Sequence, residues 1–222
     1  MAEMDPENRL LARATRMRLP AQMIRDQALA ISGLLTERIG GPSVGPYQPE
    51  GLWDDIVERG QEYRLSTGED LYRRSLYTFW KRTRPAPAMI TFDSSTRETH
   101  IVAPTRTNTP LQALNLMNDV TYTEAARALA QKVMQRGEAV DDSLRYMYRL
   151  ATARFPNSSV LSILNDAYSG HLENFGTNRG AALELISEGE SRRDETLDIT
   201  ELASYQMVAS LIMNLDGTIT RD

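Results

Sequence analysis

Residues 119–133 decide the fold class of this chain, and they read DVTYTEAARALAQKV. Thr121 and Glu124 have the spacing of a capping box, in which two side chains at a helix start bond reciprocally to the backbone. Apolar residues then recur every three or four positions: Ala125, Ala126, Leu129, Ala130 and Val133. This period predicts an amphipathic helix with one buried face.

Four further segments downstream repeat this pattern, and short polar connections join them. We expect helices around 144–151, from Ser158 or Ser159 onward, over 181–188 and over 199–213. The apolar stripe of the last one consists of Leu202, Tyr205, Ala209 and Ile212. Successive helices joined by a few residues pack as antiparallel hairpins, so this half of the chain predicts a compact helical bundle.

Helical spacing also occurs upstream of residue 119. It predicts helices over 6–18, 20–37 and 70–82. A further helix should begin at Asn108-Thr109-Pro110, because a polar cap is followed there by a proline at the first helical position. We expect that helix to bury Leu111, Leu114 and Met117.

The remaining segments read as loop or short strand. Three prolines and four glycines in residues 40–51 exclude regular structure, and we expect an ordered loop packed on the body. Residues 89–92 (MITF) and, more weakly, 101–102 resemble strands. The expected fold is mainly α: one domain over 1–222, a compact helical bundle with an ordered Pro/Gly-rich loop and at most a minor short strand pair. Its expected parts are the opening helices and loop (1–67), an Arg/aromatic segment (68–118) and helical hairpins (119–222).

Composition excludes several classes of function. Of the 222 residues, 41% are hydrophobic and 25% are charged, which is typical of a globular protein, and the net charge of -5 argues against a nucleic-acid partner. There is no cysteine, and His100 and His171 are the only histidines, so we expect no metal site and no cofactor. No stretch approaches the roughly 20 apolar residues of a membrane helix, and the first residues lack a signal-peptide pattern.

The charge is unevenly distributed along the chain. Residues 71–106 carry a net charge of +5, and the rest of the chain carries -10. The basic residues of this segment are Arg73, Arg74, Lys81, Arg82, Arg84, Arg97 and Arg106, and its acidic residues are Asp93 and Glu98.

This basic segment offers a candidate binding site. On a helix over 70–82 the polar face would carry Arg73, Arg74, Tyr77 and Lys81. Guanidinium groups so placed can bind carboxylates, sulfates or phosphates, and aromatic rings can stack on sugars. The other candidate binding residues in the segment are Arg97, Arg106 and Asn108. The alternative is structural: these arginines pair with acidic residues elsewhere in the fold.

Three carboxylates are weak candidates for catalysis: Asp26, Asp93 and Glu98. Glycoside hydrolysis needs two carboxyl groups about 5 to 10 Å apart, and no sequence pattern places two of these together. We favour the structural interpretation, in which Arg25-Asp26 and Arg97-Glu98 are ion pairs and Thr107-Asn108-Thr109 is a helix cap. Whether the chain is an enzyme stays open at this point.

Several blocks of the sequence resemble a planctomycete-type family catalogued as domain of unknown function 1553. The blocks are residues 73–83 (RRSLYTFWKRT), Arg97-Glu98, residues 106–114 (RTNTPLQAL), residues 18–26, residues 40–44 (GGPSV) and Asn214-Leu215-Asp216. The resemblance runs in order from about residue 8 to 221. The family's usual upstream segment, with its Asn-Arg and Trp motifs, has no counterpart before Asn8. Thr99-His100 stands where relatives more usually have Val-Cys.

The resemblance implies an exported protein, periplasmic or at the cell surface, whose relatives are often fused to cytochrome c modules. We therefore expect a binding or interaction module of a bacterial cell-envelope protein that recognises an anionic glycan, another anion or a partner protein domain. One alternative is a carbohydrate-active enzyme that uses a carboxylate pair. The other is a docking scaffold for a cytochrome-type electron-transfer domain, whose acidic surface would meet the basic segment.

Overall fold

The structure is a computed structural model. It describes residues 3–12, 14, 16–49, 51–52, 63–81, 83–103 and 105–221. The sequence-based expectation for Arg82, in the basic segment, lies outside the described residues.

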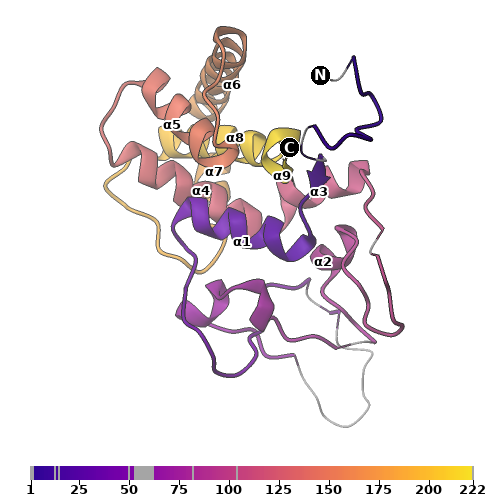
Figure 1. The fold of residues 1–222 in the computed structure, drawn as a ribbon. Helices are drawn as coiled ribbons and strands as arrows, with labels where there is room; N and C mark the ends of the chain where they lie inside the picture. The colour runs from indigo at the N-terminus through magenta and orange to yellow at the C-terminus, as the bar shows by residue number, and fades with distance from the viewer. Residues whose placement is uncertain are drawn as a thin grey trace.

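Helix α8 (Ile199–Met213) forms the centre of the fold (Figure 1). Side chains are buried around its whole circumference, which places it in the interior, and helices α4, α6 and α7 pack against it. The carboxylate of Asp198 caps its first turn by accepting hydrogen bonds from the amides of Thr200 and Glu201, at 2.8 and 3.0 Å. The predicted bounds of 199–213 are confirmed.

Four helices surround α8 and form the predicted bundle. They are α4 (Val120–Met134), α5 (Val140–Thr152), α6 (Ser158–Thr177) and α7 (Arg179–Ile186). The predicted buried stripe of α4 is confirmed, because all five of its alanine, leucine and valine side chains are inaccessible. The predicted caps were displaced by one or two residues. Asp119 accepts from the amide of Thr121 at 2.9 Å, and Asn157 accepts from the amide of Val160 at 2.8 Å.

Helix α1 (Ala21–Ser32) links the bundle to the rest of the chain. It packs on α4 on one side and contacts the segment around residue 75 and helix α2 on the other (Figure 1). The helix predicted over 20–37 is thus confirmed in its position but ends earlier, because Gly33 adopts a left-handed conformation with φ of 86°. That conformation is typical of a helix C-terminus.

The helix predicted over 70–82 is wrong. The chain forms two short 3-10 helices instead, η1 (Gly68–Tyr72) and η2 (Ser75–Tyr77), with extended backbone between them. Long-range contacts impose this conformation. The buried guanidinium of Arg25 donates hydrogen bonds to the carbonyls of Leu71 and Arg73, both at 2.8 Å. These carbonyls are therefore not available for the backbone hydrogen bonds of a helix.

The strand predicted over 89–92 is also wrong, because these residues lie in and just after helix α2 (Pro87–Thr91). Pro87 occupies the first turn, where a proline favours a helix, and the carbonyl of Ala86 accepts from the amides of Met89 and Ile90. Met89 and Phe92 are buried in the core.

Helix α3 (Pro110–Asn118) begins as predicted, with Thr109 as the cap and Pro110 in the first position. Its predicted buried face is wrong, however, since Leu111, Leu114 and Met117 are 60%, 54% and 50% exposed. Gln112 and Leu116 face inward instead. The side-chain amide of Gln112 donates to the carbonyl of Thr91 at 2.9 Å, and this bond turns the opposite face of α3 outward.

The helix predicted over 6–18 does not form within the described residues. Leu10 and Leu11 are exposed, so an apolar stripe here has no packing partner. The carboxylate of Asp5 accepts hydrogen bonds from the amides of Arg9 and Leu10. The segment ends in strand β1 (Met17–Arg18), which pairs antiparallel with β2 (Thr220–Arg221) directly after helix α9 (Asp216–Ile219). This ribbon is the minor strand pair of the expected mainly α fold.

One cluster of buried apolar side chains extends from Ala21 in α1 to Ile219 in α9. Every α-helix of the described residues contributes at least one side chain to this cluster, which fixes α1 and α2 against the bundle. Among the described helices, none is both long and apolar enough to cross a membrane.

Candidate functional site

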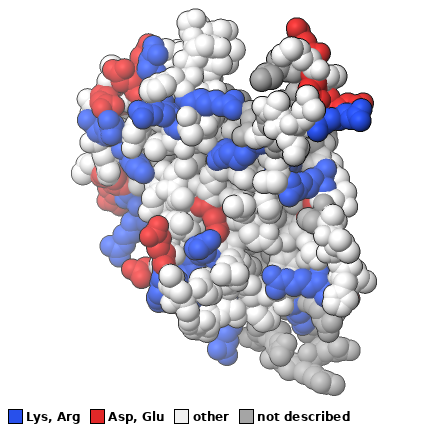
Figure 2. Space-filling model, viewed as in Figure 1, with Lys and Arg blue, Asp and Glu red and all other residues white. Residues whose placement is uncertain are grey.

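A cavity of about 210 Å³ lies where strand β1, the start of α1 and the loops after α2 meet. We call it the β1–α1 cavity. It is lined by three arginines, Arg18, Arg97 and Arg106, and by one acidic residue, Asp93, so its formal charge is +2. On the face shown in Figure 2, the right-hand half below the N-terminal segment displays several basic side chains and little acidic surface.

Arg18 reaches the cavity from strand β1, and its guanidinium lies over the ring of Phe92 at 5.9 Å from the centroid. Its Nε atom is buried and has no hydrogen-bond partner in the described part of the chain. Burial lowers the pKa of Arg18 below its ordinary value, while the nearby charge of Asp93 opposes this shift. A buried donor without a partner costs free energy, so an acceptor in the cavity would stabilise Arg18.

Arg97 is held by an aromatic ring and by an unusual backbone conformation. Its guanidinium lies 4.9 Å from the centroid of the Trp80 ring, and the indole Nε1 of Trp80 donates to the carbonyl of Thr96 at 3.2 Å. Arg97 has φ of 63° and Asp93 has φ of 60°. Residues other than glycine rarely adopt positive φ, and such strain is concentrated at functional sites.

Asp93 is occupied by hydrogen bonds from within the protein. Its carboxylate accepts from the amide of Thr107 at 2.6 Å and from the hydroxyl of Thr107 at 2.9 Å. The side chain of Gln112 donates to the same hydroxyl at 3.1 Å. This arrangement holds the 105–107 segment, and therefore Arg106, beside the cavity.

The N-terminus of α1 completes the cavity wall. Ala21 and Gln22 line it, and no side chain caps this helix, whose cap residue is Pro20. The amides of Ala21 and Gln22 have no hydrogen-bond partner among the described residues. The positive end of the helix dipole and these free amides favour an anion. Gln22 also donates to the hydroxyl of Ser94 at 2.8 Å, which ties α1 to the loop after α2.

No carboxylate in the described part of the chain forms an ion pair with Arg18, Arg97 or Arg106. Some arginines elsewhere do form such pairs: Arg38 pairs with Asp70, and Arg127 pairs with Glu124. The cavity therefore gathers three guanidinium groups whose charge the described residues do not neutralise by direct pairing.

Comparison with known proteins agrees with the resemblance noted in the sequence. The family model described as PSD1, protein of unknown function (DUF1553), matches residues 1–168. The chain belongs to the DUF1553 family. No curated protein and no solved structure gives a significant match to it.

Five of the six blocks that carry the DUF1553 resemblance meet at two places in the fold. Residues 18–26 run from the end of β1 through the first half of α1, and Arg97 and Arg106 belong to two further blocks, so these three blocks meet at the β1–α1 cavity. The GGPSV block at 40–44 and the RRSLYTFWKRT block at 73–83 meet at a second place, around Arg73.

Arg73 holds the Pro/Gly-rich loop of this DUF1553 domain. Its side chain is 0% exposed and donates to the carbonyls of Pro42 and Arg38, at 3.0 and 3.2 Å, and to that of Gly40. It also lies 3.9 Å from the centroid of the Tyr77 ring, and the hydroxyl of Tyr77 accepts from the amide of Gly40 at 2.8 Å. Arg73 is therefore not on an exposed polar face, contrary to the expectation from helical spacing.

The other candidate residues lie outside the β1–α1 cavity. Asp26 accepts from the amide of Ser75 at 2.6 Å and lies 3.6 Å from Arg74, so this acid anchors η2 to α1. Lys81 pairs its backbone with Arg84 in an isolated bridge. Glu98 and Asn108 are exposed. Of the candidate residues, the structure brings Arg97, Arg106 and Asp93 together at the cavity, and elsewhere it places Arg73 against Tyr77 and Arg74 beside Asp26.

Sequence reasoning missed two parts of the cavity: Arg18 and the start of α1. A signal for both was present, because Arg18-Leu19-Pro20 places an arginine directly before a helix whose cap has no side-chain acceptor. The expected helix over 6–18 obscured it, since Arg18 was then the end of a helix rather than part of a strand.

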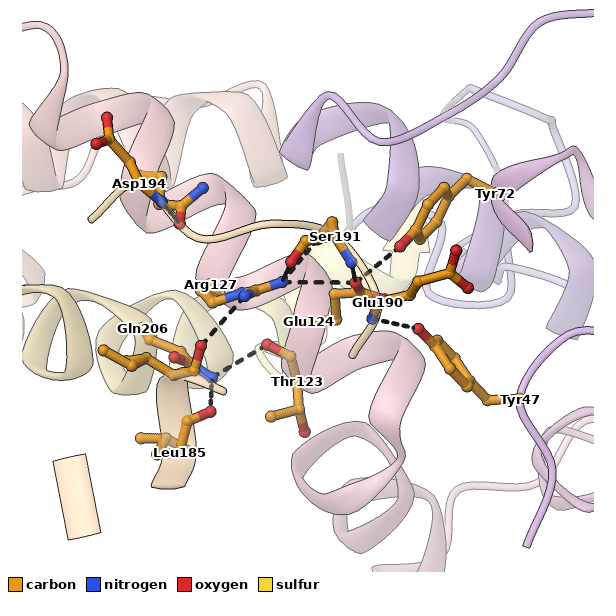
Figure 3. A network of polar contacts seen from close by, with 12 residues as sticks. Tyr47, Tyr72, Thr123, Glu124, Arg127, Leu185, Glu190, Ser191, Asp194 and Gln206 are labelled. Carbon is orange, nitrogen blue, oxygen red and sulfur yellow. Dashed lines mark hydrogen bonds and ion pairs between the residues drawn. The ribbon is translucent and has the colours of Figure 1, made fainter. Parts of the chain in front are cut away.

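A second polar cluster joins α4 to two distant segments (Figure 3). Glu124 is buried and accepts from the hydroxyl of Tyr72 at 2.8 Å and the amide of Ser191 at 2.6 Å. Arg127, also buried, lies 3.5 Å from Glu124 and donates to the carbonyl of Ile186 at 3.1 Å.

This Glu124–Arg127 cluster acts as a structural clamp. Burial and the charge of Glu124 raise the pKa of Tyr47 to about 12, so its hydroxyl stays protonated at neutral pH. The same hydroxyl accepts from the amide of Glu190 at 2.7 Å. Since Glu124 and Arg127 are buried, neither reaches a ligand in solution, and the cluster fastens the 187–196 segment and η1 to α4.

Proposed function

We propose that this domain is a binding module that holds an anionic group in the β1–α1 cavity. The observation that supports it best is the meeting of three arginines without carboxylate partners and an uncapped helix N-terminus at one cavity. Guanidinium groups bind carboxylates, sulfates and phosphates through two parallel hydrogen bonds. The free amides of Ala21 and Gln22 add donors of the kind that bind anions at other helix starts.

The size of the cavity limits the ligand to a small acidic group. Its volume of about 210 Å³ is below the roughly 300–1,000 Å³ of pockets for drug-sized ligands. One acidic sugar residue, or the anionic end of a larger molecule, suits it. That the ligand is a saccharide, and that the domain works at the cell envelope, are parts of this proposal. Both rest on the family resemblance, which implies an exported protein.

The test is isothermal titration calorimetry with galacturonate as the probe and galactose as its uncharged counterpart. Galacturonate should bind and galactose should not, and the affinity should fall as ionic strength rises. Arg97→Gln and Arg106→Gln should each weaken binding about tenfold, the effect of losing one charge-assisted hydrogen bond.

Arg145→Gln is the matched control, because Arg145 is exposed on α5 and does not line the cavity. It should bind galacturonate as the unaltered protein does. Equal weakening in all three variants would show that only overall charge matters, and unchanged binding in Arg97→Gln and Arg106→Gln would refute the proposal.

The two other functions considered for this sequence gain no specific support. Asp26 and Glu98 do not line the cavity that Asp93 lines, and Asp93 itself is bonded to Thr107, so no pair of these acids faces a shared cavity. A docking face built on Arg73 is not available, because Arg73 is buried.

A further inference from the structure

A second cationic cavity, of about 250 Å³, adjoins the β1–β2 ribbon at the C-terminal end of α5. We call it the α5–α9 cavity. It is lined by Arg16, Arg154 and Arg221 and by one acid, Asp216, so its formal charge is also +2. Arg16 pairs with Asp216, and Arg221 donates to the side chain of Gln27 at 3.0 Å and to the carbonyl of Thr218 at 3.2 Å. The guanidinium groups of Arg16 and Arg221 are thus held in position at the cavity wall.

The two cavities are neighbours along the ribbon. Arg18, in the β1–α1 cavity, pairs in the strand ladder with Thr220, which lines the α5–α9 cavity. Residues paired across an antiparallel ladder lie about 5 Å apart. Arg16 directly precedes strand β1 and is two residues from Arg18, so neighbouring positions of one short segment contribute an arginine to each cavity.

Backbone strain is shared between the two cavities. The described residues include five non-glycine residues with positive φ, and three of them line these cavities: Asp93 and Arg97 the first, and Ala153 (φ 58°) the second. Such conformations cost about 1–3 kcal/mol each and persist where the surrounding structure requires them. Their concentration here distinguishes the two cavities from the rest of the surface.

We infer that the two cavities bind one ligand: an acidic polysaccharide that crosses the β1–β2 ribbon and places one anionic group in each. This inference rests on the proposed function of the β1–α1 cavity and extends it to a chain-like ligand. Each cavity alone is small, but together they reach the size range of a full ligand site. Linking two anionic groups makes the second binding event intramolecular, so a chain binds more tightly than its single units.

A saccharide fits these cavities better than a nucleic acid does. Single-stranded nucleic acids need exposed aromatic side chains on which bases stack, as well as a basic surplus. Among the described residues, Phe92 is the one aromatic side chain that lines either cavity, and it is buried with the guanidinium of Arg18 over its ring. The whole chain carries a net charge of -5. Two arginine-rich cavities without stacking surfaces suit carboxylates or sulfates spaced along a carbohydrate chain.

The test is calorimetry with oligogalacturonates of one to six units on the intact chain. The unaltered protein should bind the hexamer about 100-fold more tightly than the monomer. Arg154→Gln should remove most of that gain while leaving the monomer-induced shift of the Ala21 amide signal, measured by NMR, unchanged. Arg106→Gln should weaken both. Arg16→Gln serves as a second variant of the α5–α9 cavity, and thermal unfolding checks that each variant is folded.

The outcomes separate this inference from the proposed function. If affinity does not depend on length, or if Arg154→Gln and Arg16→Gln match the Arg145→Gln control, the two-cavity ligand is refuted and the single anion site stands. If Arg106→Gln leaves monomer binding unchanged, the anion site itself fails. If a single-stranded oligonucleotide of equal charge binds as tightly as the hexamer, the assignment to a polysaccharide is overturned.

Discussion

At the scale of single residues, burial decides what each arginine does. Arg73 and Arg25 donate to backbone carbonyls in the interior, and Arg18, Arg97 and Arg106 lie at a cavity. Adjacent residues do not separate the two groups, since Arg25 and Arg97 are each followed directly by an acidic residue. Only the fold separates the structural arginines from those that can meet a ligand.

Arg73→Met should lower the free energy of unfolding by about 3 kcal/mol, because three hydrogen bonds to carbonyls are each worth about 1 kcal/mol. Arg74→Met is the matched control. Arg74 is more than half exposed and pairs only loosely with Asp26, so its loss should cost under about 1 kcal/mol. Urea unfolding measures both. Equal stabilities, or weaker galacturonate binding in folded Arg73→Met, would contradict the structural role of Arg73.

Asp119 supplies a prediction about pH. Burial raises the pKa of Asp119, and the hydrogen bonds from Thr121 and the charge of Arg25 only partly oppose this shift. Because the pKa of this carboxyl group is higher in the folded state than in the unfolded state, its protonated form stabilises the fold. That stabilisation is complete below the unfolded-state pKa and is lost as pH rises through the folded-state pKa. Asp119→Asn keeps an oxygen that can cap α4 but removes the charge.

The Asp119→Asn variant should therefore melt at a higher temperature than the unaltered protein at pH 7. The difference should shrink as pH falls toward about 3.9, the value for an unfolded aspartate, because both side chains are then neutral. Thermal unfolding at several pH values measures it. A lower melting temperature at pH 7 would show that the ionised carboxylate stabilises the helix start.

At the scale of elements, the Glu124–Arg127 cluster fixes a long connection that apolar packing alone does not hold. Gly189 lies in this connection with φ of 88°, and a Cβ atom added there would come within 2.3 Å of Glu124 Cδ. Gly33, at the end of α1, has a similar φ of 86° but open space around it. Substituting each glycine in turn therefore distinguishes the cost of backbone strain alone from the cost of strain with a steric clash.

Gly33→Ala should cost about 1–2 kcal/mol, the strain of a left-handed conformation. Gly189→Ala should cost at least about 3 kcal/mol, because it also disturbs a buried ion pair. Chemical unfolding gives both values, and limited proteolysis should cut the Gly189→Ala variant within 187–196. Equal costs for the two variants would mean that the clamp does not constrain the connection.

The elements also show how far the sequence predicts this fold. Helix α8 was predicted from its apolar residues at helical spacing, which are a local signal. The predictions of a helix over 70–82 and a strand over 89–92 were wrong. Arg25 donates hydrogen bonds to carbonyls that a helix over 70–82 would use, and Pro87 begins a helix that includes most of 89–92. Within the candidate site, Arg97, Arg106 and Asp93 were recognised from charge alone, whereas Arg18 and the uncapped start of α1 depend on which segments meet in space.

At the scale of the whole molecule, an acidic chain gathers basic groups at two cavities beside one ribbon. The ribbon joins residues 17–18 to residues 220–221, so nearly the whole length of the chain must fold before either cavity is complete. Binding of an anion should consequently stabilise the folded protein as a whole, by an amount that rises with ligand concentration.

The most direct measurement of the central claim is a titration of the ¹⁵N-labelled protein with sulfate, followed by NMR. The account predicts saturable shifts of the Ala21 and Gln22 amides and of the Arg18 and Arg97 Nε signals, with Arg73 unaffected. Shifts confined to other surfaces, or shifts that increase linearly without saturation, would show that the β1–α1 cavity does not bind anions.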